Sequence, residues 1–302
     1  MENFIMMAQL QGLLLMYMVI GYTLRKKNLL EEQAVRGVTN MLIYVLLPCM
    51  IFNSFKEASS QTQWTQALHA LCVAFAVSLL SMLFNKWLYQ KYPDGKKSIL
   101  RYGTLVPNSA FAGLPLAKLA YGDIGLFYAS IYVIPTRIFM WSAGVSLFAN
   151  ASRRERIKNA LLNPGMLAVA AGMLRMLLKI EIPPFLDKAI IGMGDSTSSI
   201  SMMVAGAILA DVKLESIEWG DLLYLSAVRL LAMPLLVLGI CRLFGIDPVA
   251  TAAGVILTGM PVGATTAILS KKYGADSVFA SKCLFFSTVC SLITIPLLSL
   301  LL

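Results

Sequence analysis

Long blocks of apolar residues, almost free of charged side chains, run through this sequence from end to end. They are residues 4–24, 41–55, 67–88, 126–148, 222–244 and 278–302. Most of them reach the ~20 residues that an α-helix needs to cross the hydrocarbon core of a bilayer. A soluble domain would have roughly a quarter of its residues charged, whereas only 14% of these 302 residues are charged and 58% are hydrophobic. The sequence therefore predicts an all-α integral membrane protein.

Ten membrane-spanning helices can be placed on this pattern. They are expected near residues 4–24, 36–55, 66–89, 103–121, 125–149, 163–180, 186–210, 220–244, 249–269 and 278–302. The first block is interpreted as a span because Glu2 stands where a signal peptide has basic residues, and Arg25-Lys26-Lys27 resembles an anchored helix end. The sixth and seventh spans are the weakest, because charged residues interrupt them.

Basic residues are concentrated in the loops on one side of these spans. The loops after the first, third, fifth and ninth spans carry Arg25, Lys26, Lys27, Lys86, Lys91, Lys96, Lys97, Arg101, Arg153, Arg154, Arg156, Lys158, Lys271 and Lys272. The opposite loops carry Lys56, Lys179, Lys188 and Arg242. The positive-inside rule then predicts a multi-pass protein of the cell membrane with both termini outside. Basic residues in short loops beside apolar blocks are typical of the cytoplasmic face of a membrane protein. This distribution accounts for the net charge of +9, so no nucleic-acid partner is expected.

Several classes of function are disfavoured by what the sequence contains. No GxxxxGK[ST] motif for ATP occurs, which argues against a self-contained primary pump. The five cysteines lie in apolar blocks without a CxxC pair, and one histidine cannot make a metal site. We therefore expect no cofactor, no metal site and no enzymatic activity.

The two halves of the chain carry related segments. Residues 107–122 lie 152 residues before residues 259–274, and Tyr121-Gly122 matches Tyr273-Gly274 at this offset. Each segment is a span interrupted by Gly, Pro and small polar residues, and each is followed by the same Tyr-Gly turn and another apolar helix. Five spans separate the copies, so the second copy must be inverted. Residues 1–150 and 151–302 are therefore expected to be two inverted five-helix repeats, an organisation typical of secondary transporters.

The prolines in these segments predict broken helices. Pro115 and Pro261 lack an amide hydrogen and clash with the preceding helical turn, so each is expected to interrupt its helix, in the fourth and ninth spans. Freed backbone groups are tolerated at membrane depth only where protein or a water-filled cavity satisfies them. The amino ends of the half-helices carry partial positive charge and favour a carboxylate. An ordinary proline kink is the alternative at each site.

Short motifs along the whole chain resemble the auxin efflux carrier family, which includes the plant PIN carriers and many bacterial permeases. In chain order they are Gly21-Tyr22 with Arg25-Lys26-Lys27, Leu47-Pro48 with Ile51-Phe52, Asn108, Gly113-Leu114-Pro115-Leu116, Pro261 with Ala264-Thr265-Thr266, and Ile293-Thr294-Ile295-Pro296. Each motif is weak alone, and their order and spacing carry the resemblance.

The resemblance implies an inverted five-plus-five fold, related to sodium–proton antiporters and bile-acid symporters. It also implies broken helices that cross in the fourth and ninth spans, and a transport domain that moves against a scaffold. Two departures count against auxin itself as the substrate: the plant carriers have a second ninth-span proline where this chain has Thr266, and a long central loop that is absent here. Bacterial relatives are described as carriers of dicarboxylates such as malate or malonate.

Seven residues at or near the breaks are expected to contact the substrate: Asn108, Ser109, Pro115, Pro261, Thr265, Thr266 and Arg137. The amide of Asn108 can donate to a carboxylate or, alternatively, cap the broken helix. The hydroxyl side chains can instead bond to carbonyls of their own helix. Arg137 lies in mid-span, where it could attract an anion or neutralise the carboxyl end of a half-helix.

Other charged residues within the spans have alternatives of their own. Asp195 could carry a coupling H⁺ or Na⁺, or it could cap the seventh span. For Arg229 and Lys282 we favour a structural role, such as neutralising half-helix ends. Lys118 is expected to extend towards the membrane surface.

The function that the sequence favours is a secondary carrier or exporter of a small organic anion, such as a carboxylate, by alternating access at a site near mid-membrane. An ion-conducting channel and a membrane-bound sensor are the alternatives. The sequence determines neither the substrate, nor H⁺ or Na⁺ as the coupling ion, nor the oligomeric state, and a homodimer is left open.

Overall fold

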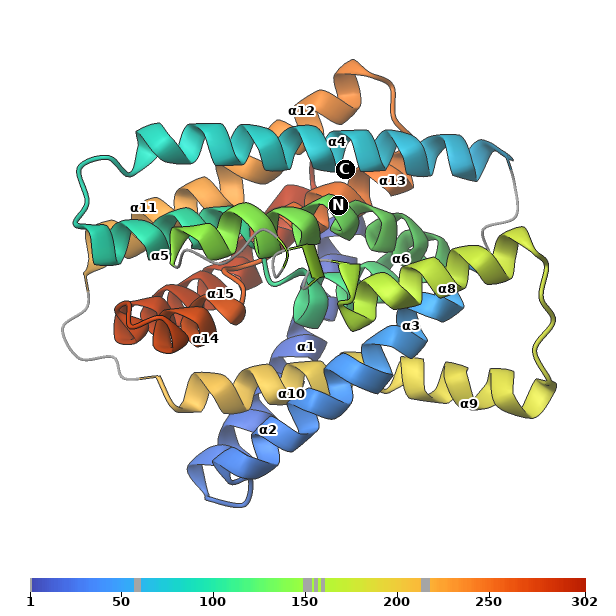
Figure 1. Cartoon of the computed structure of the whole chain (residues 1–302), viewed down its shortest axis with the longest axis horizontal. Helices are drawn as coiled ribbons and strands as arrows, with labels where there is room; N and C mark the ends of the chain where they lie inside the picture. Colours follow the sequence, from blue (N-terminus) through green and yellow to red (C-terminus); the bar gives the residue numbers. More distant parts are fainter. Residues whose placement is uncertain (1, 57–60, 149–153, 155–156, 159–160, 213–217) are drawn as a thin grey trace.

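The computed structural model is built of helices joined by short connections (Figure 1). It describes residues 2–56, 61–148, 154, 157–158, 161–212 and 218–302. In chain order the elements are α1 (Glu2–Lys26), α2 (Glu32–Met41), η1 (Leu42–Leu46), α3 (Leu47–Ser54), α4 (Gln61–Leu88), α5 (Asp94–Leu105), η2 (Ser109–Gly113), α6 (Leu114–Phe139), η3 (Met140–Gly144), η4 (Val145–Leu147), α8 (Pro164–Leu177), α9 (Pro184–Asp195), α10 (Thr197–Ala210), α11 (Trp219–Ala227), η5 (Val228–Ala232), α12 (Met233–Leu243), α13 (Pro248–Thr258), α14 (Thr265–Lys272) and α15 (Ser277–Ser299). Within these residues there is no β-strand, which confirms the all-α class. The expected boundary between halves at residues 150–151, and the basic residues Arg153 and Arg156, lie outside the described residues.

Six helical stretches in the described residues are long and apolar enough to cross a membrane. They are Asn3–Lys26, Glu32–Ser54, Gln63–Leu88, Ser109–Leu147, Trp219–Leu243 and Ser277–Ser299. Two shorter apolar helices, α8 and α13, add to them. These helices support a multi-pass membrane protein, as the sequence predicted.

The longest of these stretches contains a sharp turn at Gly122. Its 39 residues exceed the length of one crossing, and Gly122 has the non-helical angles φ 65° and ψ −157° within α6. Gly274, its counterpart in the second half of the sequence, also has a positive φ, of 71°. Glycine adopts this conformation at little steric cost. The Tyr-Gly turn that was expected after each interrupted segment is thus confirmed.

The helices pack as two groups. The first group contains α1, α2, α3, α8, α9 and α10, with α1 lying along α10 and α3 against α8 and α9. The second group contains α4, α5, α6 and α11–α15, in which α6 packs between α4 and α13. In Figure 1 α4 runs across the upper part of the second group, whereas α2, α9 and α10 lie at the bottom. The groups meet where α1 contacts α15 and where α3 contacts α6.

The core of the second group lies around α6 and α13. Residues 125–133 of α6 and 250–258 of α13 are buried without interruption. A helix that is buried around its whole circumference needs to be apolar or internally satisfied on every face. These two helices are therefore held inside the second group, while α1 and α4 expose apolar faces outward.

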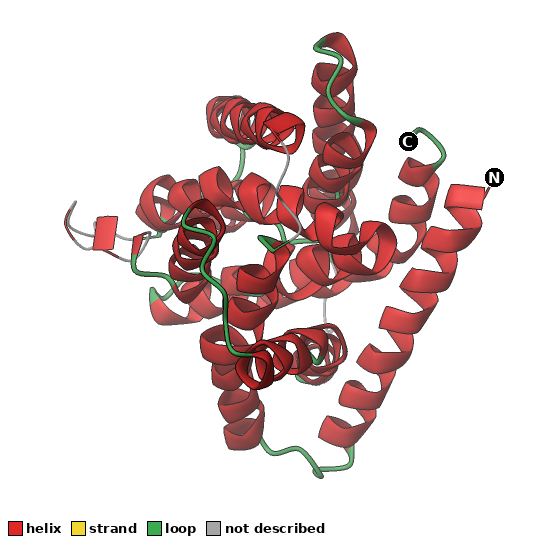
Figure 2. Cartoon of the chain, turned by 90° about the vertical axis from the view of Figure 1, so that its right-hand side faces the viewer, coloured by secondary structure: helices red, strands yellow, loops and turns green. Residues whose placement is uncertain are grey.

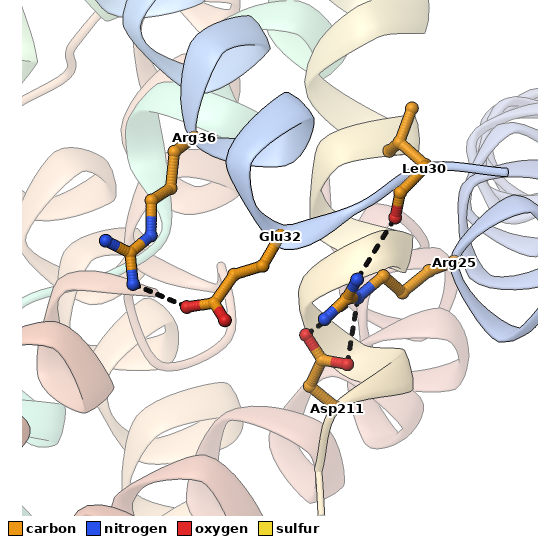
Figure 3. Close-up of polar contacts among 5 residues, drawn as sticks. All are labelled: Arg25, Leu30, Glu32, Arg36 and Asp211. Atoms are coloured by element: carbon orange, nitrogen blue, oxygen red, sulfur yellow. Dashed lines mark hydrogen bonds and ion pairs between the residues drawn. The ribbon is translucent and has the colours of Figure 1, made fainter. Parts of the chain in front are cut away.

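Ion pairs join the ends of neighbouring helices at several positions. Arg25, at the end of α1, donates from Nε to both carboxylate oxygens of Asp211 at 3.0 Å and from Nη1 to the Leu30 carbonyl at 3.2 Å (Figure 3). Lys282 is paired with Glu218, with 3.3 Å between Nζ and Oε2. The structural role favoured for Lys282 thus takes the form of an ion pair beside the start of α11.

The two chain termini lie close together in both views (Figures 1 and 2). This agrees with the packing of α1 against α15, the first and last helices.

Two glycines allow α1 and α10 to pack closely. A Cβ atom built on Gly21 would lie 1.9 Å from the Met203 carbonyl oxygen, and one on Gly206 would lie 1.9 Å from the Met18 carbonyl oxygen. Small residues that let backbones approach are typical of helix contacts in membranes, where no hydrophobic effect drives association. The first group therefore depends on this pair of glycines.

We predict that Gly206→Ala and Gly21→Ala each destabilise the protein by about 1–3 kcal/mol, because the added methyl group overpacks the contact. Thermal unfolding of the purified protein in detergent measures this. Gly12→Ala is the control, because a Cβ atom at this position of α1 meets nothing within 4 Å. Equal midpoints for all three variants and the parent would show that the close contact is absent.

Candidate functional site

Two helices are interrupted at the centre of the second group. The first interruption follows α5, where Val106 is extended with φ −114° and ψ 99°, and it ends where η2 begins at Ser109. The second separates α13, which ends at Thr258, from α14, which begins at Thr265. Pro107 lies in the first interruption and Pro261 in the second. We call residues 106–108 the first break and residues 259–264 the second break.

The two breaks pair with each other through their backbones. Pro107 and Val262 form an isolated antiparallel bridge. The Asn108 amide donates to the Pro261 carbonyl at 2.8 Å, and the Gly263 amide donates to the Val106 carbonyl at 3.0 Å. Two of the backbone donors and two of the carbonyls freed at the breaks are thus satisfied by the opposite break. Irregular backbone inside a membrane protein requires such partners.

The position of the first break corrects the sequence analysis, which placed it at Pro115. Pro115 is the second residue of α6 and follows the π-helical turn η2. In this turn the Gly113 amide donates five residues back to the Asn108 carbonyl at 3.2 Å. Such a widened turn accommodates a proline ring and its missing donor without ending the helix. Pro48 and Pro234 likewise follow the π turns η1 and η5. By contrast, Pro261 lies where the sequence analysis expected a break, between the end of α13 and the start of α14.

Arg229 connects the carboxyl ends of both broken helices. Its guanidinium group donates to the carbonyl of Thr104 at 2.8 Å, of Thr258 at 2.7 Å and of Met260 at 3.1 Å. Thr104 is near the end of α5 and Thr258 is the last residue of α13. The side chain is 2% exposed, and its charge faces the negative ends of two helix dipoles. These contacts confirm the structural role favoured for Arg229.

The larger cavity lies between the two groups, with an empty volume of about 560 Å³ that includes space at its mouth. From the first group it is lined by α1 and α10, and from the second by both breaks, α6 and α15. Its polar side chains are Gln11, Asn108, Thr288 and Ser291. Among the described residues that line it, none is charged. Asn108 and Pro261 are the two expected site residues that the structure brings together here.

A smaller cavity, with about 310 Å³ of empty volume, lies on another side of the breaks. Pro107, Ser109 and Arg229 line it together with residues of α4. Ser109 therefore faces a different space from its neighbour Asn108.

The other expected substrate contacts lie away from both cavities. Thr265 accepts a hydrogen bond from the Tyr102 hydroxyl at 3.2 Å, and Thr266 is fully buried within α14. Arg137 donates to the Asn163 side chain at 3.2 Å, at the start of α8. Neither these residues nor Pro115 line either cavity.

Asp195 is the last residue of α9 and forms an ion pair with Lys118 of α6, at 2.5 Å. No capping hydrogen bond from a side chain is present at the start of α10. The Lys118 ammonium group also lies 3.9 Å from Asp123. Because α9 belongs to the first group and α6 to the second, this pair joins the two groups, as does the contact between Arg137 and Asn163.

Sequence reasoning did not single out Gln11, Thr288 or Ser291 as lining the cavity. They are uncharged residues within regular helices, and no break or motif marks them. Only the packing of α1 and α15 against the breaks shows what they face. No group of three His, Cys, Asp or Glu side chains that could hold a metal ion occurs within the described ranges.

Comparison with known proteins gives one family and two relatives. The family described as membrane transport protein matches residues 4–160 and 153–299. An uncharacterized transporter of Methanothermobacter thermautotrophicus is 24% identical, covering 95% of this chain and 96% of its own length. An uncharacterized transporter of Methanocaldococcus jannaschii is also 24% identical, covering 94% of this chain and 95% of its own length.

We predict that Arg229→Met lowers the free energy of unfolding by about 3 kcal/mol or more, because three buried carbonyl groups lose a charged donor. Thermal unfolding in detergent measures the effect, and Arg229→Lys should lose less. Arg242→Met is the matched control, because Arg242 lies farther along the same span at its exposed end. An Arg229→Met variant as stable as the parent would show that these contacts do not hold the breaks.

Proposed function

Because the chain belongs to the membrane transport protein family, which includes the auxin efflux carriers, we propose that it is a secondary transporter of a small organic anion such as a carboxylate. The observation that carries this proposal is the pairing of two helix breaks beside a cavity between two groups of helices. A membrane enzyme would need reactive side chains at that place, whereas this cavity offers amides, hydroxyls and apolar walls.

The electrostatics of the breaks favour an anion in the larger cavity. The helix that starts at Ser109 and α14, which starts at Thr265, begin beside the cavity residues Asn108 and Ala264. The amino ends of helices carry partial positive charge and free amide donors. The opposite, negative ends of α5 and α13 are covered by Arg229. An anion near Asn108 would therefore meet a favourable field without a cationic side chain.

We further propose that the chain forms ten spans as two inverted repeats, residues 1–150 and 151–302, whose broken fourth and ninth spans cross near mid-membrane. The six long apolar stretches, the division of one of them at Gly122 and the shorter helices α8 and α13 support this arrangement. The matching positive-φ glycines, 152 residues apart, support the repeat. An experimental structure in which either span is one continuous helix would contradict it.

Movement of one group against the other would open the larger cavity to alternate sides of the membrane. The contact of Lys118 with Asp195 crosses between the groups, so it would break and re-form during such movement. We propose that Asp195, released from Lys118, binds the coupling H⁺ or Na⁺. If so, Asp195→Asn should abolish uptake driven by an ion gradient while sparing exchange.

Transport by the purified protein in proteoliposomes tests the function directly. A panel of labelled mono- and dicarboxylates is offered with an imposed proton or sodium gradient. Saturable uptake of at least one carboxylate supports the proposal, and an uptake that neither gradient changes removes the coupling role from Asp195. Conductance of inorganic ions without carboxylate movement would show a channel instead.

The termini are predicted to be outside the cell, because the basic loops after the first, third and fifth spans should face the cytoplasm. A single cysteine added at either terminus of a variant without the five native cysteines should react with an impermeant reagent on intact cells. Reaction only after the membrane has been disrupted would reverse the orientation.

Asn108→Ala is predicted to reduce transport about ten- to a hundredfold, because a hydrogen bond to a charged group contributes about 1.5–3 kcal/mol. The variant should still reach the membrane, since a cavity wall contributes little packing. Ser109→Ala is the matched control, because Ser109 lines the smaller cavity. Poor expression of Asn108→Ala with unchanged transport per molecule would mean that Asn108 only supports the first break.

A further inference from the structure

Two amide side chains face the larger cavity from opposite groups of helices. Gln11 belongs to α1 in the first group, and Asn108 belongs to the first break in the second group. They are 7% and 8% exposed, respectively. Across the described part of the chain, neither side chain has a hydrogen-bond partner. The hydroxyls of Thr288 and Ser291 differ, because both donate to carbonyls of α15 at 2.7 Å.

The two side chains open onto the cavity, so their amide groups are free to pair with whatever occupies it. Polar groups in such positions are normally satisfied by a ligand or by ordered water. One cavity joins the two amides, and a molecule in it can contact both. Such a molecule would bridge the two groups whose relative movement the proposed transport requires.

The lining of the cavity limits the charge of that molecule. The partial positive charge of the helix amino ends lies on the Asn108 side, near Ala264. Gln11 is in the tenth position of the 25-residue helix α1, far from that helix's ends. A second negative charge beside Gln11 would therefore be buried without a counter-charge, which is costly. An uncharged hydrogen-bonding group meets no such penalty.

Most of the remaining wall is apolar. Leu14, Met202, Ile208 and Leu284 line the space around the two amides. This surface favours a hydrocarbon segment on the ligand, because burying it removes apolar area from water.

We propose that Gln11 determines substrate specificity, and that the substrate is a carboxylate with one negative charge, an apolar flank and a second, uncharged hydrogen-bonding group such as a hydroxyl. The carboxylate lies beside Asn108 and the uncharged group beside Gln11. This inference rests on the proposed function, and it disfavours the dicarboxylates carried by the bacterial permeases that the sequence resembles.

Binding of a matched series of six-carbon acids tests the inference. The series contains hexanoate, 2-, 3- and 6-hydroxyhexanoate, and adipate, whose sixth carbon is a second carboxylate. Calorimetry on the purified protein measures binding, so passive diffusion of the acids through lipid does not interfere. At least one hydroxyhexanoate should bind about tenfold or more tightly than hexanoate and adipate, because a site built to pair a hydroxyl rejects the analogue that lacks it.

Gln11→Leu should remove this preference, because the hydroxyl then loses its partner. Hexanoate binding should stay within about twofold, because hexanoate makes no hydrogen bond to Gln11 and the leucine keeps the wall apolar. Gln9→Leu is the matched control, because Gln9 lies on the same helix and is exposed. Asn108→Ala should weaken every member of the series.

Three results would overturn the inference: equal binding of hexanoate and all hydroxyhexanoates, tighter binding of adipate, or a hydroxyl preference that survives Gln11→Leu. Each leaves the proposed function standing if carboxylates are still transported. Failure to bind or transport any carboxylate would instead reject the proposed function, and the inference with it.

Discussion

Backbone groups inside a bilayer have no water to pair with, so they must form their hydrogen bonds within the protein. The other features of this site follow from how the two breaks meet this requirement. The breaks exchange two backbone hydrogen bonds, and Arg229 donates to three carbonyls at the ends of α5 and α13. The guanidinium group also balances two negative helix ends with one fixed charge. Each break thus supplies backbone hydrogen-bond partners to the other.

The same arrangement gives the larger cavity its chemistry. With Arg229 at the carboxyl ends, the amino ends of the half-helices are left to face the cavity, and Asn108 is placed at one of them. Because α1 and α10 form the opposite wall, the cavity lies at the junction of two groups that contact each other less extensively than they pack internally. If the groups move against each other as proposed, a site at this junction would change its exposure, whereas a site inside either group would not.

Much of this architecture could be predicted from physical chemistry in the sequence. Uncharged blocks predicted the membrane helices, and Tyr121-Gly122 and Tyr273-Gly274 predicted the turns. The cost of a buried charge indicated that Arg229 has a structural role at the helix ends. The prediction of a break at Pro115 was wrong, because a π turn that no sequence pattern marks accommodates the proline ring within the helix. Gln11 was missed because a single amide in an apolar helix forms no sequence pattern. The ion pair of Lys118 with Asp195 was missed because the two residues are 77 positions apart in the sequence.

An experimental structure of the purified protein with a transported carboxylate bound tests the central claim most directly. The account predicts ligand density in the larger cavity, with the carboxylate beside Asn108 and the second break and with the paired breaks intact. Ligand density elsewhere in the protein, with this cavity filled only by water, would contradict it.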